Sequence, residues 1–168
     1  MDKYFGKYRA TVLNNIDPMQ MGRLMVQVPD VSNVIPSSWA MPCLPFAGIQ
    51  NGFYVVPAIG SGVWVEFEQG NSDYPICVGC FWGSAADVPA LALAAPPAIQ
   101  QVVVQTVQMN TLVLSDVPGP TGGIILKSTS GAMIAINDVG ITIDNGQGAT
   151  IVMTGPSITI NEGALEVV

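Results

Sequence analysis

Histidine is absent from this 168-residue chain, and charge of either sign is scarce. Five basic residues stand against twelve acidic ones, which gives a net charge of −7. So few basic residues argue against nucleic acid or an anionic membrane surface as a partner. The lack of histidine also removes the usual base of a nucleophile triad and a common metal ligand. The composition therefore predicts no nucleic-acid partner and disfavours hydrolytic chemistry.

Carboxylates are the remaining candidates for acid–base catalysis. Glu66 and Glu68 lie two residues apart, on one face of an expected strand and beside solvent. Two acids in this position are typical of the wet face of a barrel. We therefore expect no enzyme activity and no cofactor.

Cysteine is also rare, with three residues in the chain. The spacing of Cys77 and Cys80 in "CVGC" suggests a zinc or redox site, but such a metal site needs four ligands and only Cys43 remains. In a regular strand, residues three apart point to opposite faces, so this pair is not expected to share a metal or a disulfide. We expect small apolar core residues in a reducing compartment and no metal.

Long apolar runs are missing. The most apolar stretch, "PALALAAPPAI" (89–99), is too short and too rich in proline to span a bilayer. The start, "MDKYFGKYR", leads into no apolar stretch of signal-peptide length. We therefore expect synthesis in the cytoplasm without a signal peptide.

Glycine, proline and β-branched residues are abundant, and they predict an all-β protein. Residues 1–83 carry about five strands separated by turns, which suits a small closed barrel. In "RLMVQVPDV", Leu24, Val26 and Val28 alternate with polar or longer residues and should face its core. Four aromatic residues are large enough to fill the barrel or, less simply, to form a stacking platform: Trp39, Trp64, Phe67 and Trp82.

Residues 84–98, "SAADVPALALAAPPA", have no usable period and are predicted to be a linker. Residues 99–168 form the second domain. From residue 124 onward it repeats an apolar-x-apolar pair, and the first members of successive pairs are 10, 7, 10, 7 and 7 residues apart. The pairs are Ile124/Leu126, Ile134/Ile136, Ile141/Ile143, Ile151/Met153, Ile158/Ile160 and Leu165/Val167.

This repeat predicts very short strands joined by tight corners of Gly, Asn, Asp and Pro. One such chain has an apolar stripe and two bare strand edges, and it encloses no core. Three chains wound around a common axis would turn every stripe inward and pair every edge. An ordinary two-sheet sandwich would need a second sheet that we do not find. The predicted trimer core is Ile134, Ile136, Ile141, Ile143, Ile151, Met153, Ile158 and Ile160.

Several segments resemble the central spike proteins of contractile injection machines, which include the phage baseplate assembly protein V type and the VgrG proteins. The most specific are the turn Asp17-Pro18-x-x-x-Gly22-Arg23 and the segment from Pro57 to Phe67, "PAIGSGVWVEF". Further similar segments are "SSWAMPCLPFAG" and "GIILKSTSGAMIAINDVGITIDNG". The resemblance implies an oligonucleotide/oligosaccharide-binding (OB) fold followed by a trimeric, intertwined β-helical or β-prism needle.

The chain departs from parts of that family. It has no lysozyme domain between barrel and needle, no large hub domain before the barrel, and no histidines to hold a metal at the tip. The resemblance therefore implies a minimal spike, closest to those of phage-tail-like extracellular injection particles. It would be assembled into a baseplate and would work with separate hub and tip subunits.

The expected function is a structural homotrimer that joins the hub and inner tube to a membrane-piercing tip. The barrel loops around 30–38 and 48–56 should face the hub, and a tip protein of the PAAR type should cover the end formed by Leu165, Val167 and Val168. The target membrane is met only on injection. The alternative is a trimeric OB-fold module that binds carbohydrate or another ligand without puncturing.

Overall fold

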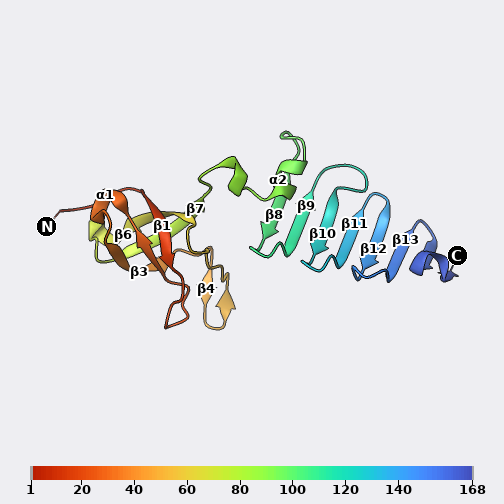
Figure 1. Cartoon of the computed structure of the whole chain (residues 1–168), viewed down its shortest axis with the longest axis horizontal. Coiled ribbons are helices and arrows are strands. Elements are labelled where there is room, and N and C mark those ends of the chain that lie inside the picture. The colour runs from red at the N-terminus through yellow and green to blue at the C-terminus, as the bar shows by residue number, and fades with distance from the viewer. Residues whose placement is uncertain (1, 168) are drawn as a thin grey trace. The chain divides into compact units, whose positions relative to one another are not determined.

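The computed structural model describes residues 2–167, which divide into two compact units between Asp87 and Val88. Both are built from β-strands with a few short helical turns (Figure 1). None of the helices within the described residues has the length and apolarity that a membrane crossing requires. The all-β prediction is confirmed.

The first unit is a closed barrel of five strands in the order β1-β2-β3-β7-β6. Its strands are β1 (Tyr8–Asn14), β2 (Leu24–Gln27), β3 (Pro36–Pro42), β6 (Gly62–Phe67) and β7 (Pro75–Phe81). The contact of β3 with β7 is parallel and the other pairings are antiparallel. Closure leaves no free edge among these strands, and the barrel is complete within one chain.

The barrel core consists of small and medium-sized side chains. Leu24, Val26 and Val28 are almost fully buried, as their alternation predicts. The expectation that aromatic residues fill the barrel is wrong for three of the four, because of the four only Phe67 is buried. Trp39 and Trp64 alternate with inward-facing neighbours, so they are half-buried on the outer surface, and Trp82 is exposed. The full core is Ala10, Val12, Leu24, Val26, Val28, Ala40, Val63, Val65, Phe67 and Cys77.

The cysteine pair departs from the predicted geometry. The pairing of β6 with β7 shifts register between Trp64 and Val65, so Cys77 lies opposite Val65 while Cys80 lies opposite Val63. The extra residue of this β-bulge puts both cysteines on one face, whereas a regular strand would separate them. Burial raises the pKa of both thiols, but only Cys77 belongs to the core; Cys80, like Cys43, is exposed.

Short elements connect the barrel strands. They are α1 (Pro29–Ser32), the hairpin of β4 (Ala47–Gly48) and β5 (Asn51–Gly52), and the 3-10 turn η1 (Glu68–Gly70). The segment 51–62, which looks like a strand in the sequence, is mostly loop after β5. The expectation that Glu66 and Glu68 share one strand face is wrong, because Glu68 begins η1 after β6 has ended.

The predicted linker, residues 84–98, holds more structure than expected. It contains η2 (Ala85–Asp87), which ends the first unit, and the helix α2 (Ala90–Ala94), which belongs to the second. The side-chain amide of Gln101 donates a hydrogen bond to the carbonyl of Ala92, which ties α2 to the first strand of the second unit.

The second unit is one antiparallel sheet of eight strands, each paired with its neighbours in sequence (Figure 1). Its elements are β8 (Gln101–Gln105), β9 (Thr111–Ser115), β10 (Gly123–Lys127), β11 (Met133–Asn137), β12 (Gly140–Asp144), β13 (Thr150–Thr154), β14 (Ser157–Ile160), η3 (Asn161–Gly163) and β15 (Leu165–Val167). We call this sheet the ladder.

The ladder differs from the predicted one in strand length and pairing. Strands β10 to β13 have five residues, and the inner strands pair on both sides within one chain. Only β8 and β15 are edge strands, so the ladder does not need a neighbouring chain to satisfy its inner hydrogen bonds. What remains uncovered in one chain is mainly the broad apolar surface of the ladder, and not the edges of its inner strands.

Asx side chains and glycines form the corners of the ladder. Asn137 Oδ1 accepts hydrogen bonds from the backbone N–H groups of Val139 and Gly140, at 2.9 and 3.3 Å. Gly140 has φ +153°, and a Cβ there would lie 2.0 Å from the carbonyl oxygen of Met153. Only glycine allows β12 and β13 to approach this closely.

Candidate functional site

One face of the ladder is apolar along its whole described length. The register aligns the side chains in two rows across the strands, because each apolar-x-apolar pair contributes one residue to each row. The first row is Val102, Leu114, Ile124, Ile136, Ile141, Met153 and Ile158. The second row is Val104, Leu112, Leu126, Ile134, Ile143, Ile151, Ile160 and Leu165. We call these two rows the apolar face.

The apolar face is poorly covered. Ile134, Ile136, Ile143 and Ile158 each expose 38–43% of their surface, whereas Val63 in the barrel core exposes none. Removing a side chain of this size from water is worth about 1.5–3 kcal/mol, so the uncovered rows strongly favour association. Monomers rarely expose a continuous apolar surface of this extent, and such surfaces mark interaction sites.

A groove of about 530 Å³ lies along the second row, between β8 and β12. Its apolar lining is Val104, Leu112, Leu126, Met133, Ile134 and Ile143. The groove is open, and its polar lining is Thr106, Asn110, Thr111, Lys127, Ser128 and Asp144. A small-molecule site would instead be enclosed, with a few convergent polar groups. The shape and lining suit an apolar protein surface.

All eight predicted trimer-core residues lie in these two rows. The structure therefore brings together on one face residues that the repeat spacing identified. Of the predicted tip-binding end, Leu165 is exposed and closes the second row. Val167 pairs through its backbone with Ile158. Its side chain and the whole of Val168 lie outside the described residues.

The prediction from the sequence did not include four members of the apolar face. Val102 and Val104 on β8, and Leu112 and Leu114 on β9, continue both rows before the predicted start of the repeat. The signal was present, because "VVV" and "LVL" contain the same apolar-x-apolar pair. The loop from 116 to 122 interrupts the regular spacing of these pairs, so the four residues were not assigned to the repeat.

The opposite face is polar only toward the C-terminal strands. The repeat predicts that the polar residues Thr142, Asp144, Thr159, Asn161 and Glu166 face outward, and Thr142 and Thr159 do lie on this face. Nearer β8 the same face carries Val103, Val113 and Ala135, and the last two are buried. The expectation of a polar outer face is therefore right for β12 and β14, whereas β13 carries Val152 in the same row and the centres of β8 to β11 are apolar.

The turn of the barrel from Asp17 to Arg23 is built around a charged clamp between these two side chains. The Arg23 guanidinium donates to both carboxylate oxygens of Asp17, with a shortest distance of 2.6 Å. The backbone N–H groups of Met19, Met21 and Arg23 donate to the same carboxylate. Its hydrogen bonds to the guanidinium, followed by those from the backbone, hold the pKa of Asp17 well below its usual range.

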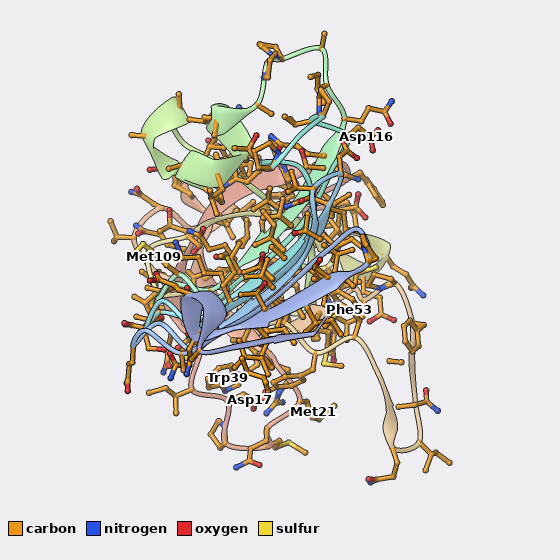
Figure 2. All side chains as sticks on the ribbon, turned by 90° about the vertical axis from the view of Figure 1, so that its right-hand side faces the viewer. Asp17, Met21, Trp39, Phe53, Met109 and Asp116 are labelled. Carbon is orange, nitrogen blue, oxygen red and sulfur yellow. The ribbon has the colours of Figure 1, made fainter. Side chains whose placement is uncertain are left out.

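Both carboxylate oxygens of Asp17 are engaged in these hydrogen bonds. The Arg23 guanidinium also lies 5.5 Å from the ring centre of Trp39. Asp17 and Trp39 are labelled in Figure 2. Within residues 2–167 no group of three or more His, Cys, Asp and Glu residues is placed to hold a metal ion.

Trp64 and Phe81, on the outer surface of the barrel, pack against each other with ring centres 5.0 Å apart. The guanidinium of Arg9 lies 5.1 Å from the ring centre of Trp64 and 5.0 Å from that of Phe81. Phe81 also covers Gly62 on the neighbouring strand, where a Cβ would meet its ring at 2.7 Å. These rings pack on the barrel itself and do not form an open stacking platform for sugars or bases.

Two family models match the chain, one for each unit. Residues 8–82 match the type VI secretion system/phage-baseplate injector OB domain. Residues 101–166 match the phage baseplate V C-terminal trimerisation domain. No curated protein matches the chain. The second match covers the ladder together with its apolar face.

Proposed function

The chain belongs to the baseplate spike proteins of the phage baseplate V and VgrG-like type, and from this premise we propose that it is the central, membrane-puncturing spike of a contractile injection machine. The families it matches are structural baseplate components. The observation that carries the proposal is the apolar face of a ladder that matches a trimerisation domain. The proposed protein is a homotrimer without catalytic activity.

In this trimer the three apolar faces meet around one axis and form a β-prism. Each side of the prism is the ladder of one chain, since the ladder already pairs its own inner strands. The largest side chains then fill the interior, and the Thr-rich part of the opposite face meets water. A prism with a dry core and continuous hydrogen bonding along its sides resists bending, as a part pushed through a membrane must.

The barrel is proposed to dock on the hub that joins the spike to the inner tube. Support comes from the predicted loop 30–38, which the structure resolves into the end of α1, a turn and the start of β3. In that turn Val34 and Ile35 expose 73% and 66% of their surface and do not belong to the barrel core. Val34→Glu should lower capture of the hub by the purified trimer at least tenfold. A particle structure in which this loop touches only solvent would contradict the assignment.

The other end of the ladder is proposed to receive a tip protein of the PAAR type. Within the described residues, β15 has no strand partner beyond β14, and Leu165 exposes 55% of its surface. An open strand edge beside an apolar side chain suits a second protein. Deleting residues 164–168 should leave the trimer intact and remove the tip subunit from purified particles. Unchanged tip occupancy would refute this assignment.

The puncturing role is tested in assembled particles. Particles with the wild-type chain should admit a membrane-impermeant dye into target cells when their sheath contracts. A chain with Ile143→Asp should yield no functional particles, while Thr142→Asp, its neighbour on the opposite face, should preserve dye entry. Normal dye entry with Ile143→Asp would show that the apolar face is not needed for the spike.

A further inference from the structure

The hairpin of β4 and β5 has no partner within its own barrel. Its two strands pair only with each other and stand away from the barrel strands (Figure 1). Ile49 at its tip exposes 93% of its surface, and Phe46 and Phe53 at its base expose 57% and 50%. A hairpin whose strands have only two residues each is at best marginally stable alone. An apolar tip on such a hairpin indicates that another surface holds it.

A second exposed apolar segment lies beside the base of this hairpin. The loop between β1 and β2 exposes Ile16, Met19 and Met21 by 75%, 64% and 44%. A hydrogen bond joins this loop to the segment that follows the hairpin, since the side-chain amide of Asn15 donates to the carbonyl of Pro57 at 2.9 Å. Gly22 also faces the ring of Tyr54, because a Cβ added at Gly22 would lie 3.5 Å from that ring.

These two segments, residues 15–22 and 46–55, form what we call the loop patch; Met21 and Phe53 are labelled in Figure 2. The charges around it indicate what binds there. No charged residue occurs between Val31 and Val65, and the carboxylate of Asp17 is neutralised by Arg23. Each chain carries a net charge of −7, so copies of the chain repel one another over much of their surface. At the loop patch two copies can meet without opposing carboxylates.

We propose that the hairpin of each barrel packs on residues 15–22 of the next barrel around the three-fold axis. The inference rests on the homotrimer of the proposed function. A contact of this kind joins two different surfaces, and with three copies it closes into a ring that leaves no hairpin unused. It assigns the predicted hub loop 48–56 to the neighbouring barrel and leaves the loop 30–38 for the hub.

Because each barrel is covalently connected to its ladder, a small contact is sufficient to hold neighbouring barrels together. Residues 82–100 connect each barrel to its ladder, and three associated ladders hold the barrels at an effective concentration in the millimolar range. A patch too small to join free monomers is then largely occupied. The hairpin thereby links the three barrels into one collar.

The test uses the full-length trimer and a photoreactive residue. Ile49 is replaced by p-benzoyl-phenylalanine, the trimer is confirmed by light scattering, and the sample is irradiated and run on a denaturing gel. Covalent dimers and trimers are expected, with the cross-link mapped by mass spectrometry to residues 15–22. Val34 replaced in the same way is the matched control, because it is an exposed aliphatic residue on the loop left for the hub, and it should give at least fivefold fewer interchain products.

The reciprocal variant places the photoreactive residue at Met19. Adding Ile49→Glu to it should lower interchain cross-linking at least fivefold, since each carboxylate would enter an apolar contact. Trimers in which position 49 cross-links only within its own chain, or only to an added hub protein, would overturn the inference. A monomeric mass of the wild-type chain would instead contradict the homotrimer, and so the proposed function itself.

Discussion

The two units cover the apolar faces of their sheets in opposite ways. The barrel closes its sheet on itself, so that side chains such as Val26 and Val63 are fully buried within one chain. The ladder stays open and leaves Ile134 and Ile143 about 40% exposed. Both units have alternating strands of similar composition. The difference shows that alternation alone does not decide whether an apolar face is covered by its own chain or by a partner.

The curvature of the sheet makes this difference. The barrel strands are interrupted by bulges and register shifts, at Val12 to Asn14 and at Trp64 to Val65, which bend the sheet until its edges meet. The ladder pairs from β8 to β15 without any such shift. A regular sheet of short strands does not close, and its apolar face therefore requires other copies.

The largest effect is expected from a charge on the apolar face. Ile143→Asp should abolish the trimer, because three carboxylates would enter one level of a dry interior at a cost of several kcal/mol each. Light scattering should give the monomer mass. Thr142→Asp, on the opposite face of the same strand, should keep the trimer mass. If both variants remained trimeric, the apolar face would not be the trimer interface.

The second-largest effect separates the steric clash at Gly140 from the strain of placing any side chain at a positive φ. Gly140→Ala should lower the free energy of unfolding by more than about 3 kcal/mol, because the new methyl group would collide with the carbonyl of Met153. Gly148→Ala is the control, since Gly148 also has a positive φ, +96°, but has open space around its Cβ position. Its expected cost is about 1–2 kcal/mol.

Denaturant unfolding followed by circular dichroism measures both glycine variants at one protomer concentration, because the stability of an oligomer depends on concentration. Equal losses for the two variants would mean that the close approach of β12 and β13 has no energetic weight.

The barrel should be more sensitive to acid at one position than at others. Because the pKa of Asp17 is lowered in the folded barrel, its carboxylate contributes stability above its ordinary pKa of 3.8, and this contribution is lost as the pH falls below that value. Asp17→Asn should therefore lower the unfolding midpoint at neutral pH, and the gap to wild type should shrink below pH 3.8.

Tryptophan fluorescence reports this transition, since Trp39 packs on the clamp through Arg23. Asp73→Asn, a change at an exposed carboxylate, is the control and should leave the midpoint nearly unchanged at both pH values. A gap for Asp17→Asn that stayed constant down to pH 2 would show that the stabilisation is not ionic.

The smallest effect is expected at the surface of the barrel. Lys7 and Glu66 form an ion pair with exposed side chains. Glu66→Gln should change the free energy of unfolding by less than about 0.5 kcal/mol, and 1 M salt should erase the difference. A loss above about 1 kcal/mol would place this pair among the structural contacts of the barrel.

Much of the ladder could be predicted from local sequence. Since side chains alternate along a strand, the pairs from Ile124/Leu126 to Ile158/Ile160 had to share a face, and the register then set them in rows. The contribution of β8 and β9 was missed because the loop 116–122 broke the spacing. The aromatic residues of the barrel were misplaced because size suggested burial, whereas the alternation with Val63 and Val65 puts Trp64 outside.

The sequence by itself determined the strand-forming segments, the turn chemistry at residues such as Asn137 and Gly140, and the existence of one long apolar stripe. These follow from local rules: the period of two along a strand, the side-chain hydrogen bonds of Asn and Asp, and the steric freedom of glycine. Only the tertiary structure decided which strands pair, that an extra residue between Cys77 and Gly79 turns Cys80 to the face of Cys77, and that the first sheet closes while the second stays open. Pairing and closure depend on contacts between residues far apart in the chain, and a single shift of one residue reverses the face of every side chain that follows.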